Sequence, residues 1–172
     1  KALLKIHDKA NHNAYQVAVT GRAAKRMQEA TSRSSRTIDG FVKNISDNEM
    51  GIPSVVIIDE ASMVDIIRMY RLVRKFSNYT RVVLVGDPYQ LPPVGPGLVL
   101  HELCGSMKSS LFPQQLVPTV ELTQVHRHGN FIAEFAKSIR HGKWPKNISR
   151  NPDFPISFIR CDKREINDII CN

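Results

Sequence analysis

Two short apolar runs, residues 55–58 and 82–85, constrain the fold most, because both lead directly into acidic residues. Asp59 and Glu60 follow the first run, and Asp87 follows the second after a single glycine. Continuous apolar runs of this length are typical of strands covered on both faces, as in a parallel sheet. A helical apolar pattern separates the two runs. We therefore expect an α/β domain with helices on both faces of a parallel sheet.

The remaining elements follow from composition and apolar spacing. Helices are predicted over residues 1–9, 22–31, 61–76, 98–107 and around 132–139, and strands over residues 16–20, 54–59, 81–85, 120–122 and 156–160. The helix over 61–76 rests on apolar residues at helical spacing, which are Met63, Ile66, Ile67, Tyr70 and Val73. Gly142 is expected to end the helix that precedes it.

Composition narrows the class of protein. The 172 residues carry 24 Lys and Arg against 16 Asp and Glu, a net charge of +8, which favours a polyanionic partner. With 42% hydrophobic residues the chain is not disordered, and no apolar run approaches the roughly 20 residues that span a bilayer. The three cysteines form no CxxC pair, which argues against disulfides or zinc. We expect a soluble, cytoplasmic protein with no membrane partner.

Ligands of parallel sheets collect at the carboxyl ends of the strands. The residues expected there are Thr20, Gly21, Arg22, Asp59, Glu60, Gly86, Asp87, Gln124 and Arg127. A hydroxyl, two acids, a polar turn and an arginine make a set suited to handling phosphate.

The acidic pair has two interpretations. An Asp at this place can hold Mg²⁺, often through water, and a neighbouring Glu can orient or deprotonate the water that attacks a γ-phosphate. Alternatively, Asp59 and Glu60 only cap the helix predicted from Ala61, where the helix dipole favours negative charge. Gln90 is similarly open. Its side-chain amide can bond a phosphate oxygen or attacking water. Alternatively, Asp87 and Gln90 belong to a proline-stiffened turn in which their side chains satisfy local backbone groups.

Longer motifs resemble one family. VVIIDEASMVD and VVLVGDPYQLPPVGPG resemble motifs II and III of superfamily 1 DNA helicases, in the RecD-like branch that includes exodeoxyribonuclease V alpha subunits and TraA proteins. VTGRAAKRMQEAT resembles motif Ia, SRTID stands where the next short motif falls, and LTQVHR resembles motif IV. The resemblance extends over residues 17–145.

The resemblance implies a RecA-like P-loop NTPase fold. It also implies an ATP-dependent helicase that uses ATP and Mg²⁺ to move 5′ to 3′ on single-stranded DNA and unwind duplex DNA in recombination and repair. Other subunits of a helicase–nuclease complex are implied partners.

The resemblance assigns roles to seven residues. Asp59 would bind Mg²⁺ through ATP, and Glu60 would be the catalytic base. Gln90 would contact the γ-phosphate and couple hydrolysis to movement, and Arg127 would stabilise the charge on that phosphate. The path of single-stranded DNA would be lined by Thr20, Gly21 and Arg22.

The chain departs from the family in one major respect, because it contains no GxxxxGK[ST] phosphate loop. Its single Gly-Lys pair, Gly142-Lys143, precedes Trp144. We therefore expect a motor fragment that starts after the first strand and phosphate loop and is inactive by itself. Residues 1–145 would form motor domain 1A, and residues 146–172 a linker, strand and helix leading toward a second RecA-like domain.

Two smaller departures concern single positions. Asp39 stands where the RecD-like pattern usually has His, and an acid would repel a phosphate backbone, so no direct DNA contact is expected there. His128 stands where the family typically has Gln. His126 and His128 are too few ligands for zinc.

Two other function classes stay open on the sequence alone. One is a noncatalytic nucleic-acid-binding module with a RecA-like fold, and the other is a superfamily 1 RNA helicase. A GKS or GKT motif upstream of Lys1 in the parent sequence would exclude the first, and stimulation of ATP turnover by RNA or by DNA separates the second from a DNA helicase.

Overall fold

The computed structural model describes residues 1–46, 50, 53–104, 117–122 and 130–144. The chain divides into two compact units, Lys1–Thr119 and Val120–Asn172, and each is described by itself. The predicted strand at 156–160 and the proposed boundary after residue 145 lie outside the described residues.

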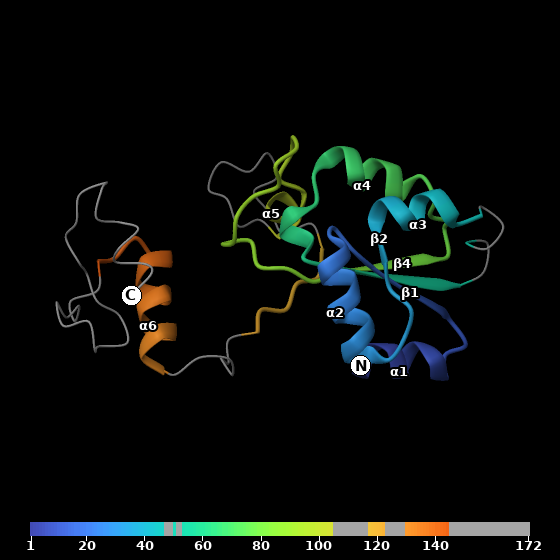
Figure 1. The fold of residues 1–172 in the computed structure, drawn as a ribbon, viewed down its shortest axis with the longest axis horizontal. Helices are drawn as coiled ribbons and strands as arrows, with labels where there is room; N and C mark the ends of the chain where they lie inside the picture. Colours follow the sequence, from blue (N-terminus) through green and yellow to red (C-terminus); the bar gives the residue numbers. More distant parts are fainter. Residues whose placement is uncertain (47–49, 51–52, 105–116, 123–129, 145–172) are drawn as a thin grey trace. The chain divides into compact units, whose positions relative to one another are not determined.

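The first unit is built on a four-stranded sheet of order β2-β1-β3-β4 in which all neighbouring strands are parallel (Figure 1). The strands are β1 (Asn13–Ala18), β2 (Arg36–Thr37), β3 (Ser54–Asp59) and β4 (Thr80–Leu84). At the carboxyl edge of the sheet, Ala18 pairs with Thr37 on one side and with Asp59 on the other. The predicted parallel sheet is confirmed, and β3 has the predicted bounds residue for residue.

The helices of this unit are α1 (Ala2–Lys9), α2 (Gly21–Thr31), α3 (Ile38–Asn44), the short 3-10 helix η2 (Ala61–Met63), α4 (Ile66–Val73) and α5 (Val99–Cys104). They cover both faces of the sheet. Val56 and Ile58 of β3 belong to a core that includes α3 and α4 residues, whereas Val55 and Ile57 pack with Leu4 of α1. Because successive strand residues point to opposite faces, this alternation explains why the run is apolar throughout. The expected α/β fold is confirmed.

The predicted helix over 61–76 is wrong as one continuous element. After η2 the chain is extended at Val64, and a new helix begins behind Asp65, whose Oδ1 accepts a hydrogen bond from the Arg68 amide at 2.7 Å. A carboxylate at this N-cap position satisfies an amide that no helical carbonyl can reach. Of the apolar residues that predicted the helix, Ile66, Ile67, Tyr70 and Val73 are exposed. The buried residue of α4 is Leu72, which that pattern did not include.

One other predicted element is wrong, and two elements of the structure were missed. Val120 and Leu122 are exposed and form no strand with the described part of the chain, so the strand over 120–122 is wrong. Strand β2 and helix α3 were not predicted. In the second unit, α6 (Asn130–Arg140) agrees with the predicted helix, and Gly142 follows it with a positive φ of 67°.

An ion pair between Asp8 and Arg33 joins the end of α1 to the segment after α2. The hydrogen bond from Arg33 lowers the pKa of the Asp8 carboxyl. Among the described residues, no helix is long and apolar enough to cross a membrane.

Candidate functional site

The turns that follow β3 and β4 are bonded to each other at the carboxyl edge of the sheet. The Val85 amide donates to the Ile58 carbonyl at 2.8 Å, and the Ala61 amide donates to the Val85 carbonyl at 2.9 Å. Gly86 lies so close that a Cβ added to it would stand 2.9 Å from the Ser62 amide nitrogen. Glycine therefore allows the close approach. The two acidic turns lie side by side, as the sequence predicts.

The acidic pair sits in the first of these turns. Both side chains are half-buried, and Asp59 Oδ1 accepts the Glu60 amide at 3.0 Å. Glu60 has left-handed backbone angles, φ 54° and ψ 39°, which cost a non-glycine residue about 1 kcal/mol. Its side chain makes no capping bond to η2, so the alternative role as a helix cap is not taken by Glu60.

An open pocket of about 200 Å³ borders Asp59 and is otherwise lined mainly by apolar side chains of α1, α2 and β3. Lys1 and Gln16 also line it. Ligand pockets usually enclose roughly 300 Å³ or more. The described residues around Asp59 thus enclose less volume than a usual ligand pocket.

Gln90 ends the turn that follows β4. The Gln90 backbone amide donates to the Asp87 carbonyl at 3.1 Å, and the Tyr89 backbone amide donates to Asp87 Oδ1 at 3.0 Å. Pro88 fixes φ at the second position of this turn. Asp87 therefore has the local structural role that the alternative interpretation gave it. The exposed Gln90 is held on a stiff turn bonded to the Asp59-Glu60 turn through Val85.

Thr20, Gly21 and Arg22 form the start of α2, directly after β1. Thr20 Oγ1 accepts the Ala23 amide at 3.2 Å, and all three residues are exposed. No atom lies within 4 Å of a Cβ added to Gly21, so the packing of the chain does not require glycine there. Because Ala18 pairs with Asp59, this helix start lies at the same sheet edge as the acidic pair.

Arg127 lies outside the described residues, as do Gln124, His126 and His128. Its assigned role stays a prediction. Among the described residues, no group of three or more His, Cys, Asp or Glu side chains could hold a metal ion.

Sequence reasoning missed two residues near the site, Asp65 and Arg68. Asp65 had a local signal, because an aspartate directly before an apolar pair is typical of a helix N-cap. Arg68 pairs with Asp39, 29 positions earlier, and no local pattern predicts that contact.

Comparisons with known proteins show the family of the chain. The sequence model of the AAA domain family matches residues 1–154. The chain is 36% identical over 138 residues to the ATP-dependent RecD2 DNA helicase of Deinococcus radiodurans, covering 74% of this chain and 18% of that protein. It is 40% identical over 88 residues to RecBCD enzyme subunit RecD of Mycolicibacterium smegmatis, covering 51% of this chain and 15% of the relative.

The corresponding RecD subunit of Mycobacterium tuberculosis is 31% identical over 148 residues, covering 73% of this chain and 25% of that protein. The chain therefore spans a quarter or less of the length of these relatives. The match to the family model covers most of the chain, and its parallel sheet brings the motif II and motif III turns into contact. The chain belongs to the AAA domain family, in the RecD-like branch of superfamily 1 helicases.

Proposed function

We propose that this chain forms part of an ATP-dependent DNA helicase and carries both ATP-handling and DNA-handling residues at one edge of its sheet. The observation that supports this most is the direct bonding of the Asp59-Glu60 turn to the Val85–Gln90 segment. This bonding holds the carboxylates of Asp59 and Glu60 and the side-chain amide of Gln90 on two adjacent, stiff turns. This arrangement is suited to a phosphate ester and an attacking water.

In this proposal Glu60 is the general base for the attacking water. Its half-buried carboxylate is held by a left-handed backbone that the bond from the Ala61 amide to Val85 fixes. Gln90 contacts the γ-phosphate or the water without adding negative charge. Arg127 supplies positive charge to the γ-phosphate in the transition state.

Asp59 fits the role of holding Mg²⁺ together with ATP. One of its oxygens accepts the Glu60 amide, which leaves the other oxygen for a metal-bound water. A single carboxylate suits Mg²⁺, which usually keeps several waters and phosphate oxygens as ligands. When bound, the ion would neutralise charge on the phosphates.

Single-stranded DNA is proposed to pass the start of α2, with movement in the 5′ to 3′ direction. Amides of a helix N-terminus attract phosphate, and the empty space in front of Gly21 allows a backbone phosphate to approach closely. Arg22 adds an exposed positive charge at the same place.

The first test is ATP turnover by the protein as the cell makes it, measured with and without single-stranded DNA. Glu60→Gln keeps the size of the side chain but removes the base, so turnover should fall by about 100-fold or more while DNA binding persists. Glu29→Gln, a matched change on the exposed face of α2, should leave turnover unaltered.

The proposal fails if the protein binds single-stranded DNA but does not turn over ATP, because it then acts as a noncatalytic binding module. It also fails if RNA stimulates turnover and DNA does not. Turnover that survives Glu60→Gln would remove Glu60 from the role of base.

A further inference from the structure

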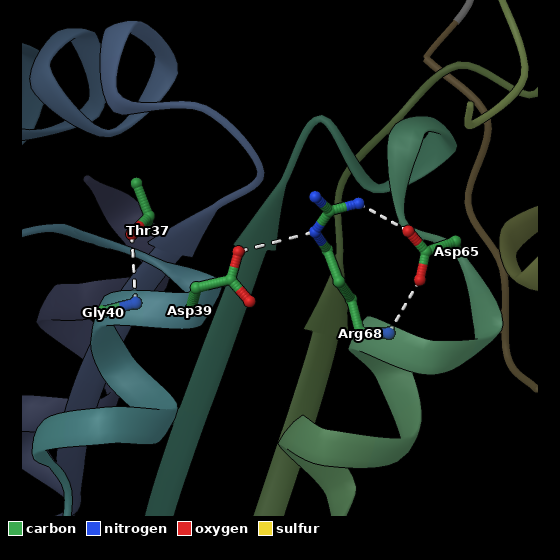
Figure 2. Close-up of polar contacts among 5 residues, drawn as sticks. All are labelled: Thr37, Asp39, Gly40, Asp65 and Arg68. Carbon is green, nitrogen blue, oxygen red and sulfur yellow. Dashed lines mark hydrogen bonds and ion pairs between the residues drawn. The ribbon is translucent and has the colours of Figure 1, made fainter. Parts of the chain in front are cut away.

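Three side chains connect the starts of α3 and α4 (Figure 2). Arg68 Nη1 lies 2.5 Å from Asp65 Oδ2, and Arg68 Nε lies 3.6 Å from Asp39 Oδ2. Asp65 stands at the N-cap of α4, and Asp39 is in the first turn of α3. One guanidinium therefore bridges two carboxylates from separate helices.

The two contacts of Arg68 differ in character. The Asp65 side chain is only 6% exposed, so it has lost most of its water and depends on Arg68 and the Arg68 amide for partners. The contact with Asp39 is an ion pair too long for a hydrogen bond. Within the part of the chain that the structure describes, Arg68 Nε is shielded from solvent and makes no hydrogen bond.

Asp65 also supports the segment that carries Gln90. A Cβ added to Gly95 would lie 2.7 Å from Asp65 Oδ2, and one added to Gly97 would lie 2.8 Å from Ile66 Cβ. Between them, the Pro96 carbonyl accepts the Ile66 amide at 2.9 Å. The end of the segment that begins at Gly86 is therefore seated directly on the start of α4.

At the other end of the bridge, α3 begins at the edge of the sheet. Thr37 is the last residue of β2, pairs with Ala18, and caps α3 by accepting the Gly40 amide at 3.1 Å. Ala18 lies two positions before Thr20, where the proposed DNA-handling segment begins. Asp39 thus ties Arg68 to the side of the sheet where single-stranded DNA is proposed to pass.

We propose that Arg68 is a positioning residue that couples the Gln90 segment to the start of α3, through Asp65 on one side and Asp39 on the other. This inference rests on the proposed function, because it explains how DNA at one part of the edge affects ATP turnover at another. In this proposal Arg68 acts through Asp65 and Asp39 and makes no contact of its own with nucleotide or DNA. The planar guanidinium can bridge two carboxylates at once, which a lysine ammonium cannot do in the same geometry.

The activity test uses the protein as the cell makes it and compares turnover with and without single-stranded DNA. Arg68→Gln and Arg68→Lys should each lower the ratio of DNA-stimulated to basal turnover by about 2- to 30-fold, the range for coupling changes carried by single side chains. Basal turnover should persist, because backbone bonds to Ile58 and Ala61 hold the catalytic turns independently of Arg68. Arg71→Gln, one turn along α4 and exposed, is the matched control.

A double-mutant cycle shows whether Asp39 acts through Arg68. Asp39→Asn should lower the ratio as well, and the double variant Asp39→Asn with Arg68→Gln should be no worse than Arg68→Gln alone. Where DNA stimulates the unaltered protein, additive losses, or a ratio unchanged in Arg68→Gln, would overturn the proposal.

Hydrogen exchange tests the connection without any need for turnover. The Ile66 amide, at the start of α4, donates to the Pro96 carbonyl. Asp39→Asn changes a residue of α3, yet it should speed hydrogen exchange of this amide. Arg68→Gln should speed exchange of both the Ile66 and Gly40 amides, and Arg71→Gln should change neither. If the unaltered protein shows no DNA-stimulated turnover but these shifts appear, the proposed function fails and the bridge stands. If DNA stimulates turnover but hydrogen exchange at Ile66 is unchanged in Asp39→Asn, the proposed Arg68 bridge is wrong and the proposed function stands.

Discussion

Glu60 is the residue at which backbone strain and proposed chemistry coincide. The described non-glycine residues with positive φ are Asn11, Ser32 and Glu60. Asn11 and Ser32 follow the ends of α1 and α2, where left-handed residues are common. Glu60 instead lies between β3 and η2, and its conformation is retained although a glycine would adopt it more easily. Strain of this kind persists where the surroundings fix it and is concentrated at functional sites.

The left-handed backbone of Glu60 predicts which of two variants, Gly or Ala, is the more stable at this position. Inside a helix or strand a Gly variant is less stable than the Ala variant by about 0.5–1 kcal/mol, but a left-handed position should reverse that order. We expect Glu60→Gly to have a higher free energy of unfolding than Glu60→Ala by about 0.5 kcal/mol, measured by urea denaturation. The same pair of changes at Glu29, in α2, should show the ordinary order. If Ala is the more stable residue at both sites, Glu60 is not strained in solution.

At the scale of elements, the caps decide where helices begin. Asp65 both caps α4 and pairs with Arg68, whereas Thr37 only caps α3. Asp65→Ala should therefore lower the free energy of unfolding by about 2–3 kcal/mol, and Thr37→Ala by about 1 kcal/mol. Equal losses in urea denaturation would mean that the Arg68 ion pair adds nothing to the cap.

The elements differ in how far the sequence alone predicts them. Strand β3 was predicted with its bounds because burial on both faces leaves an uninterrupted apolar run. Helix α3 was missed because its seven residues include Gly40 and little apolar periodicity, and the packing of Ile38 and Phe41 in the core stabilises it. The acidic pair and the Gln90 turn were found from strand ends alone. The Arg68 bridge depends on contacts distant in sequence, which no local pattern encodes.

Across the first unit, one sheet edge carries both proposed activities. The ends of β3 and β4 lead to Asp59, Glu60 and Gln90, and the end of β1 leads to the start of α2. The opposite edge carries the end of α1, since Lys9 precedes β1 by a few residues. A net charge of +8 attracts nucleic acid to any face, so the total charge alone does not locate the binding site.

The salt dependence of binding to single-stranded DNA shows which sheet edge carries the binding site. Each phosphate contact with single-stranded DNA contributes about 0.7 to the slope of log affinity against log salt. Arg22→Gln should reduce that slope by about 0.7 and weaken binding alike for different sequences. Lys9→Gln removes the same charge from the opposite sheet edge, so it should leave the slope unchanged. Slopes measured by fluorescence anisotropy that fall equally in both variants would show that DNA responds to the total charge and not to the start of α2.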